Sequence, residues 1–154
     1  MKKLSIVLLC LVTALSYAQI GIRNARGQNC TNNLKQVGLG LAIFMDDNGN
    51  RLPAKLDDAK SYVPASVCIC PASRKPFIYL GSLRGNNNNA AIPVVMDRIG
   101  NHNGQINVLM KDGHVTTIRH NAKNYQGLLP YFKGLSAQQK AELAKILKRL
   151  DTGR

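Results

Sequence analysis

Residues 101–119, "NHNGQINVLMKDGHVTTIR", contain the pattern that decides the fold. Asp112-Gly113 lies between two runs, 104–110 and 114–119, that are rich in β-branched and other apolar residues. Such runs are typical of strands, and Asp-Gly accepts the positive φ angles that a type I′ turn needs. The stretch therefore predicts a β-hairpin with a two-residue loop.

A two-residue loop also sets the register of the hairpin. It pairs Met110 with Val115 and Val108 with Thr117. Because side chains alternate along a strand, Ile106, Val108 and Met110 share one face of the sheet. We expect this face to pack on the N-terminal helix.

The same stretch carries His102 and His114, two of the three histidines in the chain. His102 precedes the first strand and His114 follows the turn. A strand of about seven residues at roughly 3.3 Å each separates them by about 20 Å, so one site cannot use both. We expect His102 to have a structural role instead, in a hydrogen bond with neighbouring backbone or with Asp97, which ends the preceding apolar run.

The rest of the globular part predicts one helix and two further strands. Residues 24–45 place Leu34, Val37, Leu41 and Phe44 on one helical stripe. Gly38 and Gly40 allow this helix to pack closely on a sheet. Residues 77–83, "FIYLGSL", and 91–97, "AIPVVMD", are typical of strands.

The C-terminal residues predict a second helix. Ser136 and Gln139 form an S-x-x-Q capping box at its start, and Gly153 follows its end. Its apolar stripe consists of Leu143, Ile146, Leu147 and Leu150. This stripe either docks on the free side of the sheet or meets a partner.

The N-terminus is typical of an exported protein. "MKK" precedes the apolar run "LSIVLLCLVTAL" (4–15), and the small residues Ser16 and Ala18 suit signal-peptidase cleavage before Gln19. Residues 1–18 are therefore expected to be a signal peptide, or alternatively a retained N-terminal anchor. We expect the protein in the periplasm, cell envelope or extracellular space, with membrane contact only if this segment is retained.

Export makes disulfides feasible for Cys30, Cys68 and Cys70. A bond between Cys68 and Cys70 would close a small strained ring, so we expect Cys30 to pair with Cys68 or Cys70 and leave one thiol over. Zinc held by Cys68, Cys70 and histidines is the alternative. The C-x-C spacing and the lack of a second cysteine pair disfavour it, and we expect no metal or cofactor.

Charge favours contact with polyanions without identifying a site. The chain has 21 Lys and Arg against 8 Asp and Glu, a net charge of +13, and its basic residues are spread along the sequence. No aromatic-rich basic motif is present. No Ser-His-Asp or Cys-His spacing suggests catalysis either, so we expect a non-enzymatic protein without a small-molecule substrate. A secreted module that binds extracellular DNA or cell-wall polymer is the alternative function.

Two motifs in order resemble a known family. They are "CTNNLKQVGLGLAIFMDDNGNRLP" (30–53) and "PVVMDRIGNHNGQINVLMKDGHV" (93–115), with Cys70-Pro71 between them. In the second motif, nine residues separate His102 from Asp112-Gly113. This pattern resembles the prepilin-type processing-associated H-X9-DG domain family, which includes pseudopilin-like, type II secretion system G-like proteins. The resemblance covers about 25–118.

The resemblance implies an α+β, pilin-like fold, in which a long N-terminal helix packs on a small antiparallel sheet. It implies partners among pseudopilin or envelope proteins in a type II secretion or type IV pilus-related assembly. The chain then divides into the leader, a pseudopilin-like domain at 19–124, and a C-terminal helical extension at 125–154.

The N-terminus departs from this family. Its members usually begin with a glycine followed by Phe-Thr-Leu-Ile-Glu, where prepilin peptidase cuts and the glutamate assists filament assembly. This chain has no such sequence, and its first glutamate is Glu142. The resemblance therefore implies the globular domain but not processing by prepilin peptidase.

Overall fold

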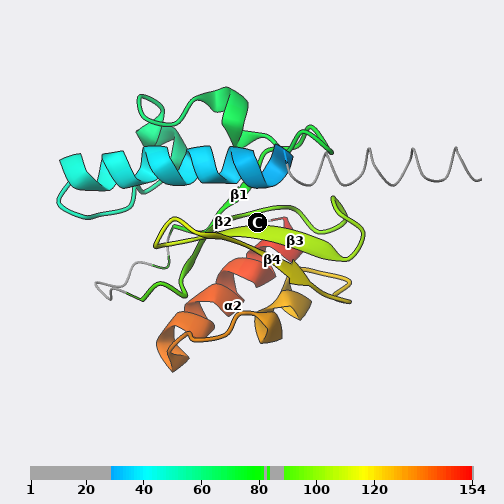
Figure 1. Ribbon diagram of the computed structural model, residues 1–154. Helices are drawn as coiled ribbons and strands as arrows, with labels where there is room; N and C mark the ends of the chain where they lie inside the picture. The colour runs from blue at the N-terminus through cyan, green and yellow to red at the C-terminus, as the bar shows by residue number, and fades with distance from the viewer. Residues whose placement is uncertain (1–28, 82, 84–88, 154) are drawn as a thin grey trace, which may run out of the picture.

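A computed structural model describes residues 29–81, 83 and 89–153. Three layers are visible in Figure 1: an N-terminal helix, a four-stranded sheet, and a layer that contains α2 (Ala137–Thr152). The described part of the N-terminal helix runs from 29 to 47. The α+β class is confirmed, whereas the predicted leader, 1–18, lies outside the described residues.

The sheet is an antiparallel meander in the order β1-β2-β3-β4. Its strands are β1 (Ile78–Tyr79), β2 (Pro93–Met96), β3 (Gln105–Met110) and β4 (Val115–Arg119). Two short 3-10 helices, η1 (Leu56–Ala59) and η2 (Ala65–Cys68), precede β1, and a third, η3 (Gln126–Tyr131), follows β4. Each strand therefore neighbours the next one in sequence.

The turn between β3 and β4 differs from the prediction. Gly113 has a φ of 87°, but Asp112 keeps a negative φ, so the expected type I′ turn is wrong. The Gly113 N–H donates to the Met110 carbonyl at 2.9 Å, and the Met110 N–H donates to the His114 carbonyl at 2.9 Å. The loop therefore holds three residues, 111–113, with Gly113 as a left-handed bulge. This turn needs only one positive φ, which glycine adopts without the steric cost that aspartate would bear.

The extra loop residue shifts the register of the hairpin. Leu109 pairs with Val115, and Val108 pairs with Thr116. The predicted pairs, Met110 with Val115 and Val108 with Thr117, are therefore wrong by one position.

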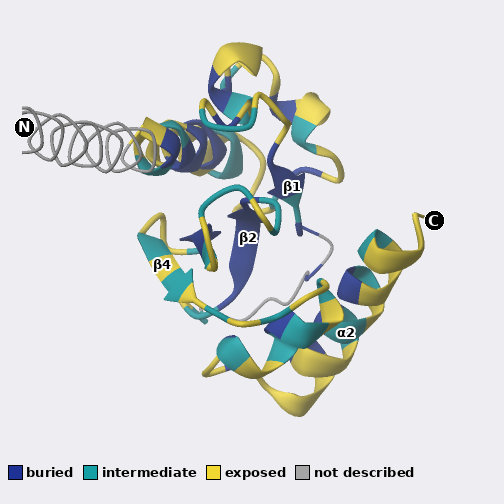
Figure 2. Ribbon diagram, turned by 90° about the vertical axis from the view of Figure 1, so that its right-hand side faces the viewer, coloured by how far each residue is buried: buried dark blue, intermediate teal, exposed yellow. Residues whose placement is uncertain are grey.

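The layer that covers the β3 face also differs from the prediction. Ile106, Val108 and Met110 share a core with Leu143 and Leu147 of α2, not with the N-terminal helix. The sheet is buried on both faces, as Figure 2 shows for β2. Alternation identifies which residues share a face but does not say which helix covers it.

The N-terminal helix packs on the opposite face of the sheet. Its buried residues Leu34, Val37 and Leu41 share a core with Val95 and Leu109. Gly38 permits this close approach as predicted, whereas Gly40 faces the segment between η1 and η2 and not the sheet. A Cβ on Gly38 would lie 2.8 Å from Cδ1 of Leu109, and one on Gly40 would lie 2.5 Å from the Tyr62 carbonyl oxygen.

Helix α2 begins and ends as its sequence predicts. The Ser136 side chain accepts from the Gln139 N–H, Gln139 completes the capping box, and Gly153 ends the helix with a φ of 67°. Leu143 and Leu147 are fully buried against the sheet, so the stripe docks within the chain. Within the described residues, no helix has both the length and the apolar character needed to cross a membrane.

Candidate functional site

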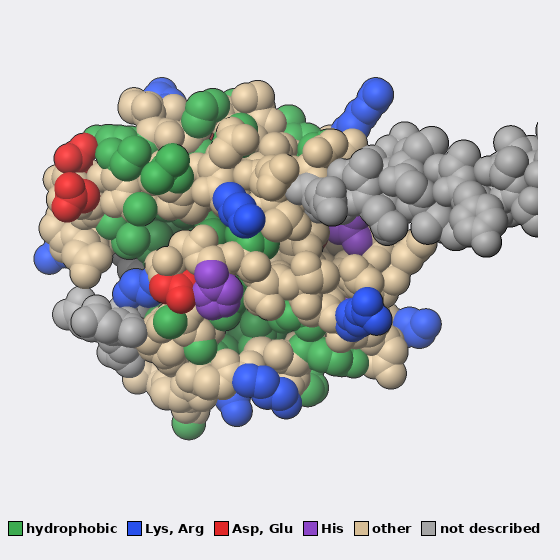
Figure 3. All heavy atoms as spheres, in the orientation of Figure 1, with side chains coloured by type: hydrophobic (Ala, Val, Ile, Leu, Met, Phe, Trp, Pro, Cys, Tyr) green, Lys and Arg blue, Asp and Glu red, His purple; other side chains and the backbone are tan. Residues whose placement is uncertain are grey.

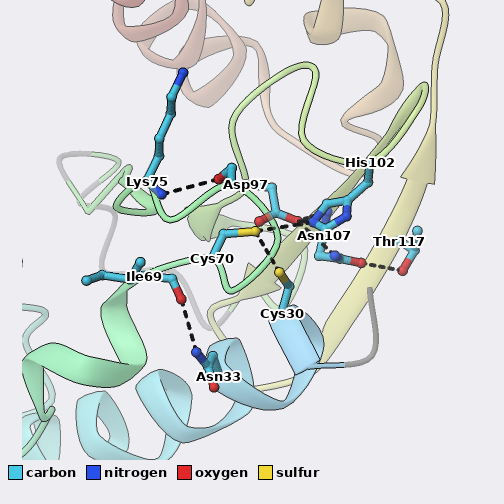
Figure 4. A network of polar contacts seen from close by, with 10 residues as sticks. Cys30, Asn33, Ile69, Cys70, Lys75, Asp97, His102, Asn107 and Thr117 are labelled. Atoms are coloured by element: carbon cyan, nitrogen blue, oxygen red, sulfur yellow. Dashed lines mark hydrogen bonds and ion pairs between the residues drawn. The ribbon is translucent and has the colours of Figure 1, made fainter. Parts of the chain in front are cut away.

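Four side chains with metal-ligating atoms meet at the end of the hairpin opposite the turn: Cys30, Cys70, Asp97 and His102 (Figure 4). Cys30 lies in the first described turn of the N-terminal helix, and Cys70 follows η2. Asp97 directly follows β2, and His102 lies in the loop before β3. Three separate segments thus contribute to this ligand cluster, and the connection between β2 and β3 supplies two of its side chains.

The contacts within the ligand cluster are short. Sγ of Cys30 lies 2.6 Å from Sγ of Cys70, which in turn lies 3.6 Å from Nε2 of His102. The same Nε2 lies 3.2 Å from Oδ2 of Asp97, and the four donor atoms all lie within 4.8 Å of one another. Cys30, Cys70 and Asp97 are fully buried, whereas the His102 side chain is 10% exposed. His102 therefore forms the solvent edge of the cluster.

Asp97 is held by a chain of hydrogen bonds that crosses the sheet. Asn107 donates to Oδ2 of Asp97 from its backbone N–H at 3.0 Å and from its side-chain amide at 2.8 Å. The Thr117 hydroxyl donates to Oδ1 of Asn107 at 2.7 Å. Oδ1 of Asp97 is buried without a hydrogen-bond partner. Oδ2 is therefore held by hydrogen bonds, whereas Oδ1 accepts none.

The cluster shifts the protonation of its own members. The hydrogen bond with Asp97, and then the contact with Cys30, raise the pKa of His102 to about 10, although burial acts in the opposite direction. Burial raises the pKa of Cys30. Burial also opposes ionisation of Cys70, but hydrogen bonds from Cys30 and from Ser73 outweigh it and lower the pKa of Cys70. The metal-free cluster thus favours a charged imidazolium beside the Asp97 carboxylate.

Of the two partners expected for Cys30, the structure brings Cys70 close and leaves Cys68 apart. Sγ of Cys68 lies 3.7 Å from the Pro64 carbonyl, outside the cluster. The 2.6 Å between the Cys30 and Cys70 sulfurs exceeds a disulfide bond of about 2.05 Å, and Cys30, Cys68 and Cys70 are all free thiols. The zinc alternative weighed from the sequence joined Cys68 with Cys70, whereas the two sulfurs that meet come from residues forty positions apart.

The other motif residues lie at the hairpin turn, at the far end of β3. Nδ1 of His114 contacts Oδ1 of Asp112 at 2.5 Å, and the side chains are 53% and 42% exposed. The Asp112 carboxylate also accepts from the His114 backbone N–H at 3.1 Å. The H-X9-DG pattern is thus divided: His102 belongs to the buried cluster, while Asp112 and Gly113 form the turn.

Sequence reasoning missed Asn107 and Thr117 as parts of the site. Asn107 is 4% exposed and interrupts the otherwise apolar run of β3. A buried amide in such a strand needs a polar partner, because an unpaired buried polar group is costly. That interruption was the available signal for a polar site on this face of the sheet.

No family model matches the chain, and no curated protein or solved structure matches it either. The donor set of the cluster, with two thiols, an imidazole and a carboxylate, is suited to binding a metal. The described residues offer no comparable set of donors elsewhere.

Proposed function

We propose that this chain is a non-catalytic, exported, pseudopilin-like protein that acts through protein–protein contacts in a type II secretion or type IV pilus-related envelope assembly. The observation that carries the proposal is an apolar pair, Leu39 and Ile43, on the outer face of the N-terminal helix. The resemblance of 30–53 and 93–115 to the H-X9-DG family supplies the class of partner.

Leu39 and Ile43 lie one helical turn apart and stay 66% and 49% exposed. Residues four positions apart share a helix face, so the two side chains form one apolar patch. The opposite face of the same helix is already buried against the sheet. An outward apolar pair on a helix that is packed on its other side suits helix-to-helix contact with a neighbouring subunit.

The pilin-like character of the fold belongs to the same proposal. One helix lies across one face of an antiparallel sheet (Figure 1), which is the arrangement that the family resemblance implies. The partner that we propose for the exposed face is the corresponding helix of another pseudopilin-like subunit.

The face drawn in Figure 3 gives no support for a specific polyanion site. On the face drawn in Figure 3, Lys and Arg side chains stand singly or in small groups around the surface. A polyanion site would gather them in one stripe or patch. Basic side chains dispersed in this way, with a net charge of +13, give generic, salt-sensitive attraction on this face.

A photo-crosslinking residue placed at position 39 or 43 tests the proposed contact in the host cell. The control is position 148 on α2, where Lys148 is also exposed. We expect crosslinks to a pseudopilin-like or envelope-assembly subunit from positions 39 and 43 but not from position 148. Equal yields at all three positions, or no product at 39 and 43, would contradict the proposal.

Export is tested separately by sequencing the N-terminus of the protein recovered from its host. We expect the mature chain to start at Gln19, as cleavage after Ala18 predicts. An intact N-terminus in a membrane fraction would instead support the retained anchor. Recovery of the intact chain from the cytoplasm would overturn export.

A further inference from the structure

We propose that Cys30, Cys70, Asp97 and His102 form a four-coordinate site for a divalent metal ion of the zinc class. The site is independent of the proposed protein contacts, because Leu39 and Ile43 lie on the outer face of the helix. The inference rests on four ligand-type atoms from three separate segments of the chain that converge within 4.8 Å.

The distances fit a tetrahedral ion with little rearrangement. Zinc bonds of about 2.3 Å to sulfur and about 2.0–2.2 Å to nitrogen or oxygen imply donor-to-donor distances of roughly 3.2–3.8 Å. The Cys70–His102 distance of 3.6 Å and the His102–Asp97 distance of 3.2 Å are already in this range. The two sulfurs, at 2.6 Å, must separate by about 1 Å, and the other pairs of donor atoms lie no more than 4.8 Å apart.

The donor types select the class of metal. Two thiolates with an imidazole and a carboxylate suit zinc and similar borderline-soft ions. Calcium and magnesium prefer sites made of oxygen atoms, which this cluster does not provide. Zinc would displace the thiol protons and the imidazolium proton on binding, as metal sites of this kind do.

The surroundings of Asp97 give independent support for a ligand. Asn107 fixes the carboxylate through two hydrogen bonds to Oδ2, and Thr117 orients Asn107 in turn (Figure 4). Outer partners of this kind orient metal ligands in known sites. Oδ1 of Asp97, in a side chain with no exposed surface, has no hydrogen-bond partner. This carboxylate therefore offers an ion two oxygens: Oδ2, which lies 3.2 Å from Nε2 of His102, and the unpaired Oδ1.

The site has four protein donors, three of them in fully buried residues. This is typical of a structural zinc site, because a catalytic zinc site leaves one position for water or substrate. Cys30 belongs to the N-terminal helix, while Asp97 and His102 flank the loop between β2 and β3. The ion would therefore fasten the start of the described helix to the ends of the central strands β2 and β3. This is a stabilising role that leaves the outer face of the helix free.

Cobalt titration of the full chain, purified with a phosphine reductant and without metal, tests the site. We expect one equivalent of cobalt to give sulfur-to-metal charge-transfer bands and the intense ligand-field bands of a four-coordinate ion, and zinc to displace it. In urea that unfolds the metal-free chain, metal should also protect two thiols, those of Cys30 and Cys70, from a thiol reagent, and a chelator should expose them. This readout needs no variant and does not depend on how a variant folds.

Matched variants identify the ligands. Cys70→Ser and His102→Gln should weaken cobalt binding by more than roughly 100-fold, because even the loss of an outer partner typically costs 10- to 100-fold. Cys68→Ser and His114→Gln are the controls, a cysteine and a histidine outside the cluster. Both should bind cobalt like the unchanged chain.

Three results would overturn the proposal. The first is that the reduced chain binds neither cobalt nor zinc. The second is that both Cys70→Ser and His102→Gln still bind the metal. The third is that Cys30 and Cys70 are recovered as a disulfide that persists under the reducing conditions.

Discussion

The two ends of the β3–β4 hairpin each hold a His–Asp pair, and the two pairs differ in almost every physical respect. Asp97 and His102 lie at one end, with 0% and 10% of their side chains exposed, and they meet two cysteines. Asp112 and His114 lie at the other end, with 42% and 53% of their side chains exposed. They contact one another, and neither belongs to the group of potential metal ligands found among the described residues.

This difference shows what makes a pair of residues into a site. Asp112 and His114 are two positions apart, so the turn itself brings them together and solvent screens their attraction. The buried pair is assembled by tertiary packing and is supported by Asn107. The same two residue types, Asp and His, thus belong to a solvated turn at one end of the hairpin and to a buried ligand cluster at the other.

Replacing the aspartate at each end of the hairpin should give the largest difference in the free energy of unfolding. Asp97→Ala leaves His102 and both donors of Asn107 without their acceptor, so we expect a loss of about 3 kcal/mol in the free energy of unfolding. Asp112→Ala is the matched control and should cost about 0.5 kcal/mol. Urea unfolding of the metal-free chain measures both, and equal losses would contradict the distinction.

Zinc should stabilise the protein through the buried end only. At a free zinc concentration about 100 times Kd, the unchanged chain should gain about 2.7 kcal/mol. His114→Gln should gain the same amount, whereas His102→Gln should gain much less. Thermal or urea unfolding with and without zinc measures the gain, and a full gain in His102→Gln would place the ion elsewhere.

Asn107→Ala should test the support of Asp97 from within the strand. The variant removes the side-chain donor to Oδ2 of Asp97 and the acceptor for Thr117, so we expect a loss of about 2 kcal/mol in the metal-free chain. Gln105→Ala is a control two positions earlier on the same strand face. Unfolding curves that match for the two variants would show that Asn107 does not support the cluster.

The exposed end should respond more to backbone than to side-chain changes. Gly113→Ala forces an L side chain into a φ of 87°, and we expect a loss of about 1 kcal/mol. Nothing lies within 4 Å of an added Cβ, so the loss would be conformational, not steric crowding with the rest of the fold. An unchanged unfolding midpoint would mean that the turn relaxes to a conformation that tolerates alanine.

Local sequence signals predicted the elements, because short-range rules set them. Ser136, Gln139 and Gly153 bound α2 as expected, and Asp112-Gly113 marks the hairpin turn. The predicted turn type was wrong because Asp-Gly suits both a two-residue type I′ loop and a three-residue loop that ends in a glycine bulge. The residues alone do not say which of the two the flanking strands prefer.

The cluster was only partly within reach of the sequence. Asp97 and His102 flank one short loop, so their proximity follows from the predicted strand ends. The position of Cys30 beside them does not follow from the sequence, because it depends on which face of the sheet the N-terminal helix covers. The sequence-based prediction assigned the helix to the wrong face. Whether Cys68 or Cys70 reaches Cys30 depends on the path of the chain after η2, which no local spacing encodes.

X-ray absorption at the zinc edge of the full chain, loaded with one equivalent of zinc, tests the central claim most directly. A site made of Cys30, Cys70, Asp97 and His102 predicts a first shell of two sulfurs at about 2.3 Å and two nitrogen or oxygen atoms at about 2.0–2.2 Å. A first shell without sulfur, or a reduced chain that retains no zinc, would contradict it.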